Sequence, residues 1–434
     1  MVSHRILGFA IAPILLATAL AWRDHRDERS HTQNALHLLR EGRDAFRDDT
    51  FGSERFWTDA LGLHRTIAGI ANGGVGPGLS PRGALGVGLK VDVERLHGRT
   101  AAALRTGRID LDDPASTLTL LEQDAVVGVR ATFGRRGRLE AVGITCALSH
   151  STVDDSLAPG IGRRLDGWPN RDLDVGSILA FAPDLTPLAH ALGVDVPTVR
   201  IVLGSWGPGR FDAHLLLDGQ AFRPDGQTAA VLLPAAFGLG GVDLATYEGW
   251  GGIAHWNAFV ANLEMHGSGT LFDRRLDDAR KFPLAAASGA GHTRAAEDRI
   301  TSKLHALQVY QLTLPVPVPR KGSFDAAAAA RGERLFAGRA DCARCHVPPI
   351  YAEPGFPMHT AAEIGIDDFQ ARRGPLDLYR TTPLRALFTK ARGGYYHDGR
   401  FATLGDVVDH YDRHFALGLS AAERRDLVEF LKSL

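Results

Sequence analysis

The stretch of sequence that decides the fold lies near the C-terminus and reads Cys342-Ala343-Arg344-Cys345-His346. Two thiols two residues apart, followed at once by a histidine, are the pattern by which a polypeptide binds haem covalently. The thiols form thioether bonds to the vinyl groups of the porphyrin, and the adjacent imidazole ligates the iron. A structural zinc site needs four ligands, and no second ligand pair follows downstream. A simple redox pair of thiols leaves the histidine without a role. The stretch therefore predicts haem c.

The flanking sequence predicts a cytochrome c domain over residues 320–434. Prolines at 315, 317 and 319 predict an extended linker before it. Helices are expected over 324–338 and 420–434, and the second begins with the capping-box pair Ser420 and Glu423. In cytochrome c domains such helices cross each other, and Gly332 would allow a close approach.

A second stretch has the same five-residue frame with serine where the second cysteine would be, and it reads Cys146-Ala147-Leu148-Ser149-His150. It predicts a second haem that is held by one thioether, because Ser149 cannot form the other bond, with His150 as the iron ligand. The alternative is a buried cysteine near an unrelated histidine. A helical segment is expected to end near Phe133, much as the helix ending at Gly338 precedes Cys342, and this parallel favours the second haem.

Composition and the N-terminus limit the class and the compartment. The 434 residues carry a net charge of −1, which excludes nucleic-acid binding through bulk positive charge. Three cysteines exclude a disulfide framework. Arg5, an apolar run over 6–22 and Ala19-Leu20-Ala21 predict a signal peptide over 1–21, with an uncleaved anchor as the alternative. We expect a periplasmic protein with no stable membrane span after cleavage.

The fold class expected for the whole chain is mainly α, because sustained strand patterns are weak. Two cytochrome c-like haem domains are expected, over 136–314 with the degenerate motif and over 320–434. A helical N-terminal extension over 22–135 would precede them.

At this point the sequence resembles the bacterial di-haem cytochrome c peroxidase family, which includes the methylamine-utilisation di-haem enzymes. The resemblance in the C-terminal domain is carried by 342–346, by Thr381-Thr382-Pro383-Leu384-Arg385, by 395–404 (Tyr-Tyr-His-Asp-Gly-Arg-Phe-Ala-Thr-Leu) and by 407–411 (Val-Val-Asp-His-Tyr). In the N-terminal domain it is looser, and it rests on Cys146 to His150, on Trp250-Gly251-Gly252 and on 262–266 (Asn-Leu-Glu-Met-His).

The resemblance implies that electrons from a small cytochrome c or cupredoxin enter at the C-terminal haem and that hydrogen peroxide reacts at the N-terminal haem. Trp250 would lie between the haems, and Glu264 would move protons. Packing in the core is the alternative role for Trp250, and a place on a helix surface is the alternative for Glu264.

The distal ligand of the C-terminal iron departs from the usual methionine of these peroxidases. The matching position is Tyr411, as in methylamine-utilisation relatives, and Met358 is the rival ligand. Core packing is the other reading of Tyr411. Arg385 would pair with a haem propionate or with a surface carboxylate. The expected metal ligands are His346, His150 and Tyr411.

The sequence thus predicts a di-haem c-type oxidoreductase that reduces hydrogen peroxide or uses it to oxidise another substrate. One alternative is an electron-transfer cytochrome with a single haem at His346. Another is a scaffold or sensor that binds haem without turnover.

Overall fold

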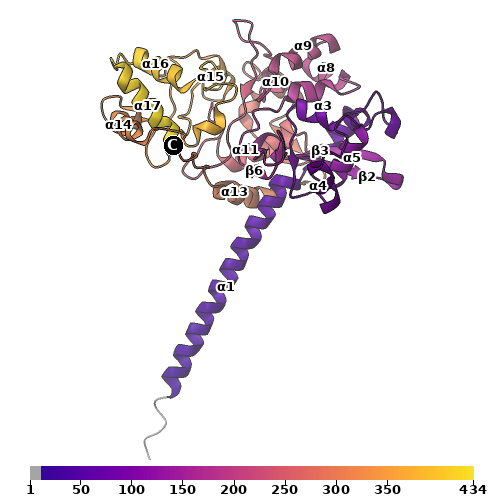
Figure 1. Ribbon diagram of the computed structural model, residues 1–434, viewed down its shortest axis with the longest axis horizontal. Helices are drawn as coiled ribbons and strands as arrows, with labels where there is room; N and C mark the ends of the chain where they lie inside the picture. Colours follow the sequence, from indigo (N-terminus) through magenta and orange to yellow (C-terminus); the bar gives the residue numbers. More distant parts are fainter. Residues whose placement is uncertain (1–10) are drawn as a thin grey trace, which may run out of the picture.

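The computed structural model describes residues 11–434, with side chains from residue 30 onward. The start of the predicted signal peptide (1–21) therefore lies outside the described residues. A long helix, α1 (Ile11–Asp48), projects from the body of the molecule (Figure 1). Its last turns pack against α13 (Leu304–Thr313), where a Cβ on Gly42 would lie 1.9 Å from the backbone oxygen of Ala306. Among the described residues, no helix combines the length and apolarity that crossing a membrane requires.

The structure is mainly helical, as expected, and its strands form only two-stranded sheets. The sheets pair β1 (Val91–Asp92) with β5 (Ile161–Gly162), β2 (Val129–Phe133) with β3 (Leu139–Ile144), β4 (Ser151–Val153) with β6 (Arg164–Asp166), β7 (Arg210–Phe211) with β8 (Val231–Leu232) and β9 (Thr270–Phe272) with β10 (His292–Arg294). Only β1 and β5 run parallel. Such short ladders cannot form a core by themselves.

The N-terminal unit (residues 30–314) is built from short helices around several apolar clusters. The α-helices after α1 are α2 (Leu63–Ala68), α3 (Pro81–Gly86), α4 (Gly98–Arg105), α5 (Pro114–Glu122), α6 (Ala147–His150), α7 (Val175–Ala180), α8 (Thr186–Leu192), α9 (Val196–Trp206), α10 (Leu215–Asp218), α11 (Ile253–Phe259), α12 (Pro283–Ser288) and α13. Two π-helical turns, η1 (Arg55–Ala60) and η4 (Val260–Glu264), and the 3₁₀ turns η2 (Ile70–Asn72), η3 (Arg135–Gly137), η5 (Arg274–Asp277) and η6 (Thr301–Lys303) complete it.

Residues 49–135 differ from the separate helical extension expected for them. Strand β2 pairs with β3 across the expected boundary at 135. One apolar cluster, moreover, runs from Trp57 to Leu233 and buries side chains from both sides of that boundary. The glycine-rich turns between these elements allow the strands to form, and hairpin pairing joins this segment to the domain that follows it.

The C-terminal unit (residues 320–434) has the crossed helices that the sequence predicts. It contains α14 (Ala326–Ala337), η7 (Cys342–Arg344), α15 (Phe369–Arg373), η8 (Leu387–Lys390), α16 (Leu404–His414) and α17 (Ala421–Ser433). Asp325 caps α14, and Ser420 and Glu423 form the capping box of α17. A Cβ on Gly332 would lie 2.0 Å from the backbone oxygen of Asp426, so α14 and α17 touch at this glycine.

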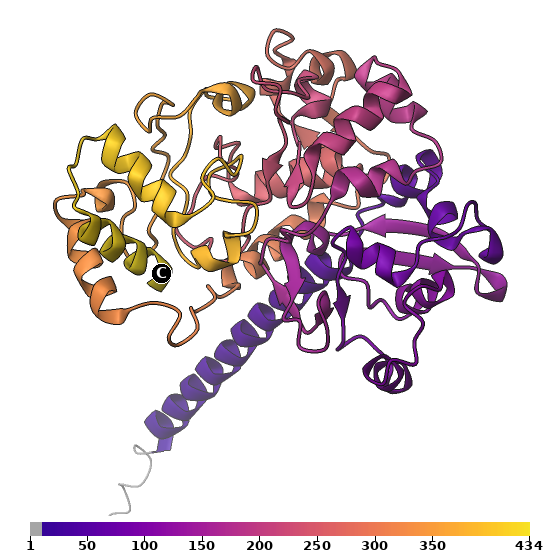
Figure 2. The same ribbon diagram turned by 45° about the horizontal axis from the view of Figure 1, so that its top comes forward.

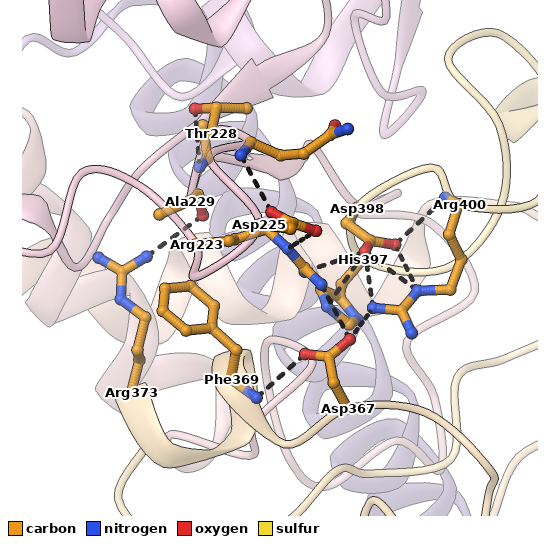
Figure 3. Close-up of polar contacts among 12 residues, drawn as sticks. Arg223, Asp225, Thr228, Ala229, Asp367, Phe369, Arg373, His397, Asp398 and Arg400 are labelled. Carbon is orange, nitrogen blue, oxygen red and sulfur yellow. Dashed lines mark hydrogen bonds and ion pairs between the residues drawn. The ribbon is translucent and has the colours of Figure 1, made fainter.

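The two units lie side by side, and buried ion pairs join them (Figures 1 and 2). Arg223 of the N-terminal unit donates to Asp367 (2.9 Å) and to Asp398 (3.0 Å) of the C-terminal unit, and Arg400 pairs with the same two carboxylates (Figure 3). Arg373, which is 2% exposed, reaches from α15 into the N-terminal unit. These contacts hold the two units in one arrangement.

Candidate functional site

The Cys342–His346 stretch folds as a single tight turn after α14. The turn η7 carries both thiols, and the backbone N–H of His346 donates to the carbonyl of Cys342 over 2.9 Å. The imidazole Nδ1 of His346 lies 3.2 Å from the carbonyl oxygen of Tyr351. Burial lowers the pKa of His346 to about 4, so the ring is neutral. A proton on Nδ1, shared with a carbonyl, leaves the lone pair of Nε2 for a metal, as in iron-ligating histidines.

The Cys146–His150 stretch has the same local geometry. Its last four residues form α6, and the N–H of His150 donates to the carbonyl of Cys146 over 3.3 Å. Nδ1 of His150 lies 3.1 Å from the carbonyl oxygen of Pro234, and burial lowers the pKa of His150 to about 4. This ring is therefore also neutral, with Nδ1 held by a backbone carbonyl and Nε2 left for a metal.

The thiol environments differ between the two stretches. Cys146 packs against an apolar cluster that includes Phe46, Phe51 and Met265, and burial raises the pKa of its thiol to about 12. Cys342 packs against the core formed by α14 and α17, and burial raises the pKa of its thiol to about 11. Both thiols are thus protonated at neutral pH.

A carboxylate and an imidazole also lie beside Cys345. Nε2 of His359 lies 2.5 Å from Oε2 of Glu353, and Thr381 donates to the same carboxylate oxygen. The ligating atoms of Cys345, Glu353 and His359 lie within 4.8 Å of one another. A thioether at Cys345 would remove its sulfur as a metal ligand, and the Glu353–His359 pair would then border the attached group.

Tyr411 and Met358 occupy different positions relative to the attachment turn. Tyr411 lies on α16, its ring centroid 6.3 Å from that of Tyr396. Burial raises the pKa of Tyr411, and the thiols of Cys345 and Cys342 lie close enough to raise it further. The sulfur of Met358, by contrast, lies against Gly249 of the N-terminal unit, where a Cβ would be 2.9 Å away. Tyr411 therefore lies within the C-terminal unit that carries the two thiols, whereas Met358 contacts the neighbouring unit.

Glu264 lines a small, partly open apolar cavity with room for water-sized molecules over about 40 Å³. It ends the π-helical turn η4, and such turns often occur at functional sites. Burial raises the pKa of Glu264 well above its ordinary value, and Asp212 raises it further. His266, which has a positive φ of 57°, stacks on Phe56 with ring centroids 3.8 Å apart. The remaining lining is almost wholly apolar: Trp57, Leu179, Leu188, Leu192, Val199, Val202, Leu203, Trp206, Phe211, Leu215 and Leu216.

Neither Cys146 nor His150 lines this apolar cavity. Cys146 packs near Ala261 and Met265, which belong to the same short segment as Glu264. The structure therefore brings Glu264 into the neighbourhood of the Cys146 stretch but on the wall of a separate cavity.

Trp250 is fully buried, and its indole N–H donates to Nε2 of His214 over 2.9 Å. The side-chain amide of Gln370, from α15 of the other unit, lies 3.4 Å from Nδ1 of His214. The guanidinium of Arg275 lies over the indole at 5.2 Å. A core tryptophan needs a partner for its N–H, but this one is also connected to the second unit through a histidine.

Arg385 lines a second small cavity, of about 40 Å³, between the two units, which we call the basic cavity. Arg171, Arg380 and Lys390 also line it, together with Tyr247, and no carboxylate does so in the described part of the chain. Burial lowers the pKa of Lys390 to about 7, and Arg171 and Arg380 lower it further. Nε of Arg171 is buried without a hydrogen-bond partner among the described residues. Such a set of cations suits carboxylate groups of a ligand.

These residues together fit a haem c. Two thiols and a neutral anchored histidine stand at the C-terminal turn, Tyr411 lies in the same unit, and the cations of the basic cavity, which no carboxylate lines among the described residues, suit propionates. Sequence reasoning found Arg385 but missed Arg171, Arg380, Lys390, His214 and Asp212. No short motif marks those residues, because they meet only through contacts between distant segments.

Comparisons with known proteins agree with the resemblance seen in the sequence. No family model matches the chain. It is 32% identical over 153 residues to the methylamine utilization protein MauG of Methylorubrum extorquens, covering 30% of this chain and 42% of that protein. It is 29% identical over 223 residues to the cytochrome-c peroxidase IdrP1 of Denitromonas iodatirespirans, covering 39% of this chain and 58% of that protein.

A solved structure of a MauG-like protein associated with microbial copper homeostasis matches 50% of this chain and 77% of that chain, with 20% identity and a TM-score of 0.30. At that score the match supports no argument about the fold. The chain spans about half the length of the curated relatives it matches. These relatives confirm the resemblance to the di-haem cytochrome c peroxidase family.

Proposed function

We propose that this chain is a periplasmic di-haem c-type oxidoreductase that reduces hydrogen peroxide, or uses it to oxidise another substrate. The observation that carries the proposal is the repeated geometry of the two Cys–His stretches. In each, the histidine N–H bonds to the cysteine carbonyl four residues earlier, and Nδ1 is held by a remote backbone carbonyl. The backbone bond is the ordinary bond of a helical turn, and the second feature keeps both rings neutral with Nε2 left for a metal.

The residues of each of the two sites would hold one haem. Cys342 and Cys345 would form two thioethers, and His346 and Tyr411 would be the ligands of the iron. Cys146 would form a single thioether, with His150 as ligand. The cations of the basic cavity, Arg385 among them, would neutralise propionates. When bound, haem supplies an iron that binds peroxide and exchanges electrons.

Glu264 is the residue placed to move protons. Its raised pKa keeps the carboxyl protonated at a pH where an exposed glutamate is ionised. It can therefore donate a proton to the outer oxygen of peroxide, which leaves as water, and recover the proton of the inner oxygen. Positioned proton transfer of this kind contributes on the order of 10²–10⁴ in rate. The apolar lining around Glu264 limits competing water.

Trp250 is the residue placed to connect the two units. Its indole is fixed by His214, which in turn contacts Gln370 of the C-terminal unit. Tyr247, which precedes Trp250 by three residues in the sequence, lines the basic cavity. Asp212 and Leu215, which flank His214 in the sequence, line the apolar cavity. We assign Trp250 the transfer of electrons between the units, with a small donor protein supplying electrons to the C-terminal haem.

A specific observation favours one alternative, an electron-transfer cytochrome with a single haem. Ser149 stands where the second cysteine would be, and Cys146 packs against an apolar cluster. In that case the Cys146–His150 stretch would hold no haem and peroxide turnover would be absent.

Peroxide turnover by the holoprotein, with a reduced cytochrome or cupredoxin as donor, tests the proposal. Glu264→Gln should lower turnover by about 10²-fold or more while both haem spectra persist. Glu122→Gln, at an exposed position on α5, is the matched control and should leave turnover unchanged. Wild-type protein that carries two haems but reduces no peroxide would refute the enzymatic role.

A further inference from the structure

Two acidic side chains from distant segments line the same apolar cavity. Glu264 comes from η4, and Asp212 follows strand β7. His266 is the remaining titratable group of the lining, and burial lowers its pKa to about 4, so it is neutral. Two carboxyl groups in an otherwise apolar wall require a reason, because each is costly to bury.

The two oxygens of Asp212 are in different situations. Oδ1 accepts from Nη2 of Arg373 at 2.9 Å and from the backbone N–H of His214 at 3.1 Å. Oδ2 is buried, as is the whole residue at 4% exposure, and it has no hydrogen-bond partner among the described residues. Asp218, the other partner of Arg373, uses both of its oxygens on the guanidinium, at 2.7 and 3.0 Å. Asp212 therefore keeps one acceptor oxygen free in the cavity wall.

The charged side chains around Asp212 carry more negative than positive charge. Arg373 supplies one positive charge to two carboxylates, and its remaining hydrogen bond goes to the carbonyl of Ala229 at 3.2 Å (Figure 3). An ionised Glu264 would add a second uncompensated negative charge beside Asp212. His214, on the far side of Asp212, is held neutral by burial and does not offset it.

We propose that Asp212 is a positioning residue that forms a carboxyl pair with Glu264. Glu264 keeps its proton, and Oδ2 of Asp212 accepts a hydrogen bond from that carboxyl or from one small hydroxylic molecule held between the two. Burial raises the pKa of both carboxyls, but Arg373 counteracts the rise for Asp212 alone, so Glu264 is the one that keeps its proton. The inference deepens the proposed function, since it explains how Glu264 stays protonated.

Infrared spectroscopy of the holoprotein tests the pair without turnover. The stretch of a protonated carboxyl, assigned to Glu264 by its loss in Glu264→Gln, is followed as a function of pH. Asp212→Asn should lower the titration midpoint of that band by about one unit or more, because a like charge in the same cavity is removed. Asp218→Asn is the matched control: it takes a carboxylate from the same guanidinium but does not line the cavity, so its shift should be much smaller.

Equal shifts in the two variants, or no shift in Asp212→Asn, would overturn the proposal. If Asp212→Asn does not fold, the triple variant Asp212→Asn, Asp218→Asn, Arg373→Met removes the whole ion set, and the midpoint should again fall. An unchanged midpoint there would overturn the pair equally. Because the band is read without peroxide, a protein inactive toward peroxide counts against the proposed function and still tests the pair.

Discussion

Replacing Gly332 by alanine should force α14 and α17 apart. A Cβ at this position would lie 2.0 Å from the backbone oxygen and 2.6 Å from the backbone carbon of Asp426. Neither atom can move without its helix, so the cost belongs at the upper end of the range for overpacking, about 3 kcal/mol. Alanine returns about 1 kcal/mol through its better helix propensity. The net loss of unfolding free energy is therefore expected to be about 2 kcal/mol.

Urea denaturation of the holoprotein measures this loss with two probes. Haem absorption reports on both proposed haem sites, whereas tryptophan fluorescence reports on the N-terminal unit alone, because all six tryptophans precede residue 257. A transition that absorption detects without a change in fluorescence therefore belongs to the C-terminal unit. Gly204→Ala is the matched control: Gly204 is exposed on α9 with nothing within 4 Å, so this variant should gain about 0.5–1 kcal/mol. A Gly332→Ala variant as stable as the wild type would refute the close crossing.

Three further predictions concern the second haem, the buried ions and pH. Ser149→Cys should complete the second attachment motif. The pyridine haemochrome band of the single-thioether haem, which is red-shifted, should then move to the position of an ordinary haem c. An unchanged spectrum would contradict a haem at Cys146. Arg373→Met should cost about 3–5 kcal/mol in urea denaturation, since Asp212 and Asp218 stay buried without a cation, and a loss under 1 kcal/mol would contradict the assigned contacts. Burial lowers the pKa of His397 from 6.5 to about 4, so the unfolded chain binds its proton first as the pH falls. His397 alone should therefore contribute a drop of about 1–2 kcal/mol in the free energy of unfolding between pH 7 and pH 5, in addition to the other buried histidines, and His397→Gln should remove that part of the pH dependence.

Local sequence signals predicted the C-terminal unit well. The caps at Asp325 and Ser420 and the small residue at Gly332 act within one helix or at one crossing, so the sequence alone expresses them. The segment that carries Glu264 is the helix α11 followed by the π-helical turn η4. A single-sequence pattern does not reveal the extra residue of a π turn, although that turn determines where Glu264 points.

The features that the sequence does not predict depend on contacts between distant segments. Arg373 and Asp212 are 161 positions apart, and nothing in either local sequence indicates that they pair. The basic cavity likewise combines Arg171 with residues 380–390. The sequence predicts a helical extension over 22–135, and the pairing of β2 with β3 across residue 135 is a contact that no local pattern in it indicates.

The number of covalent haems on the protein, matured in a host that exports it and loads haem, tests the account most directly. Intact-mass spectrometry of the purified chain should show two haems, and Cys146→Ala should remove exactly one of them while leaving the haem at Cys342 and Cys345. A wild-type mass with a single haem, unchanged by Cys146→Ala, would contradict the account.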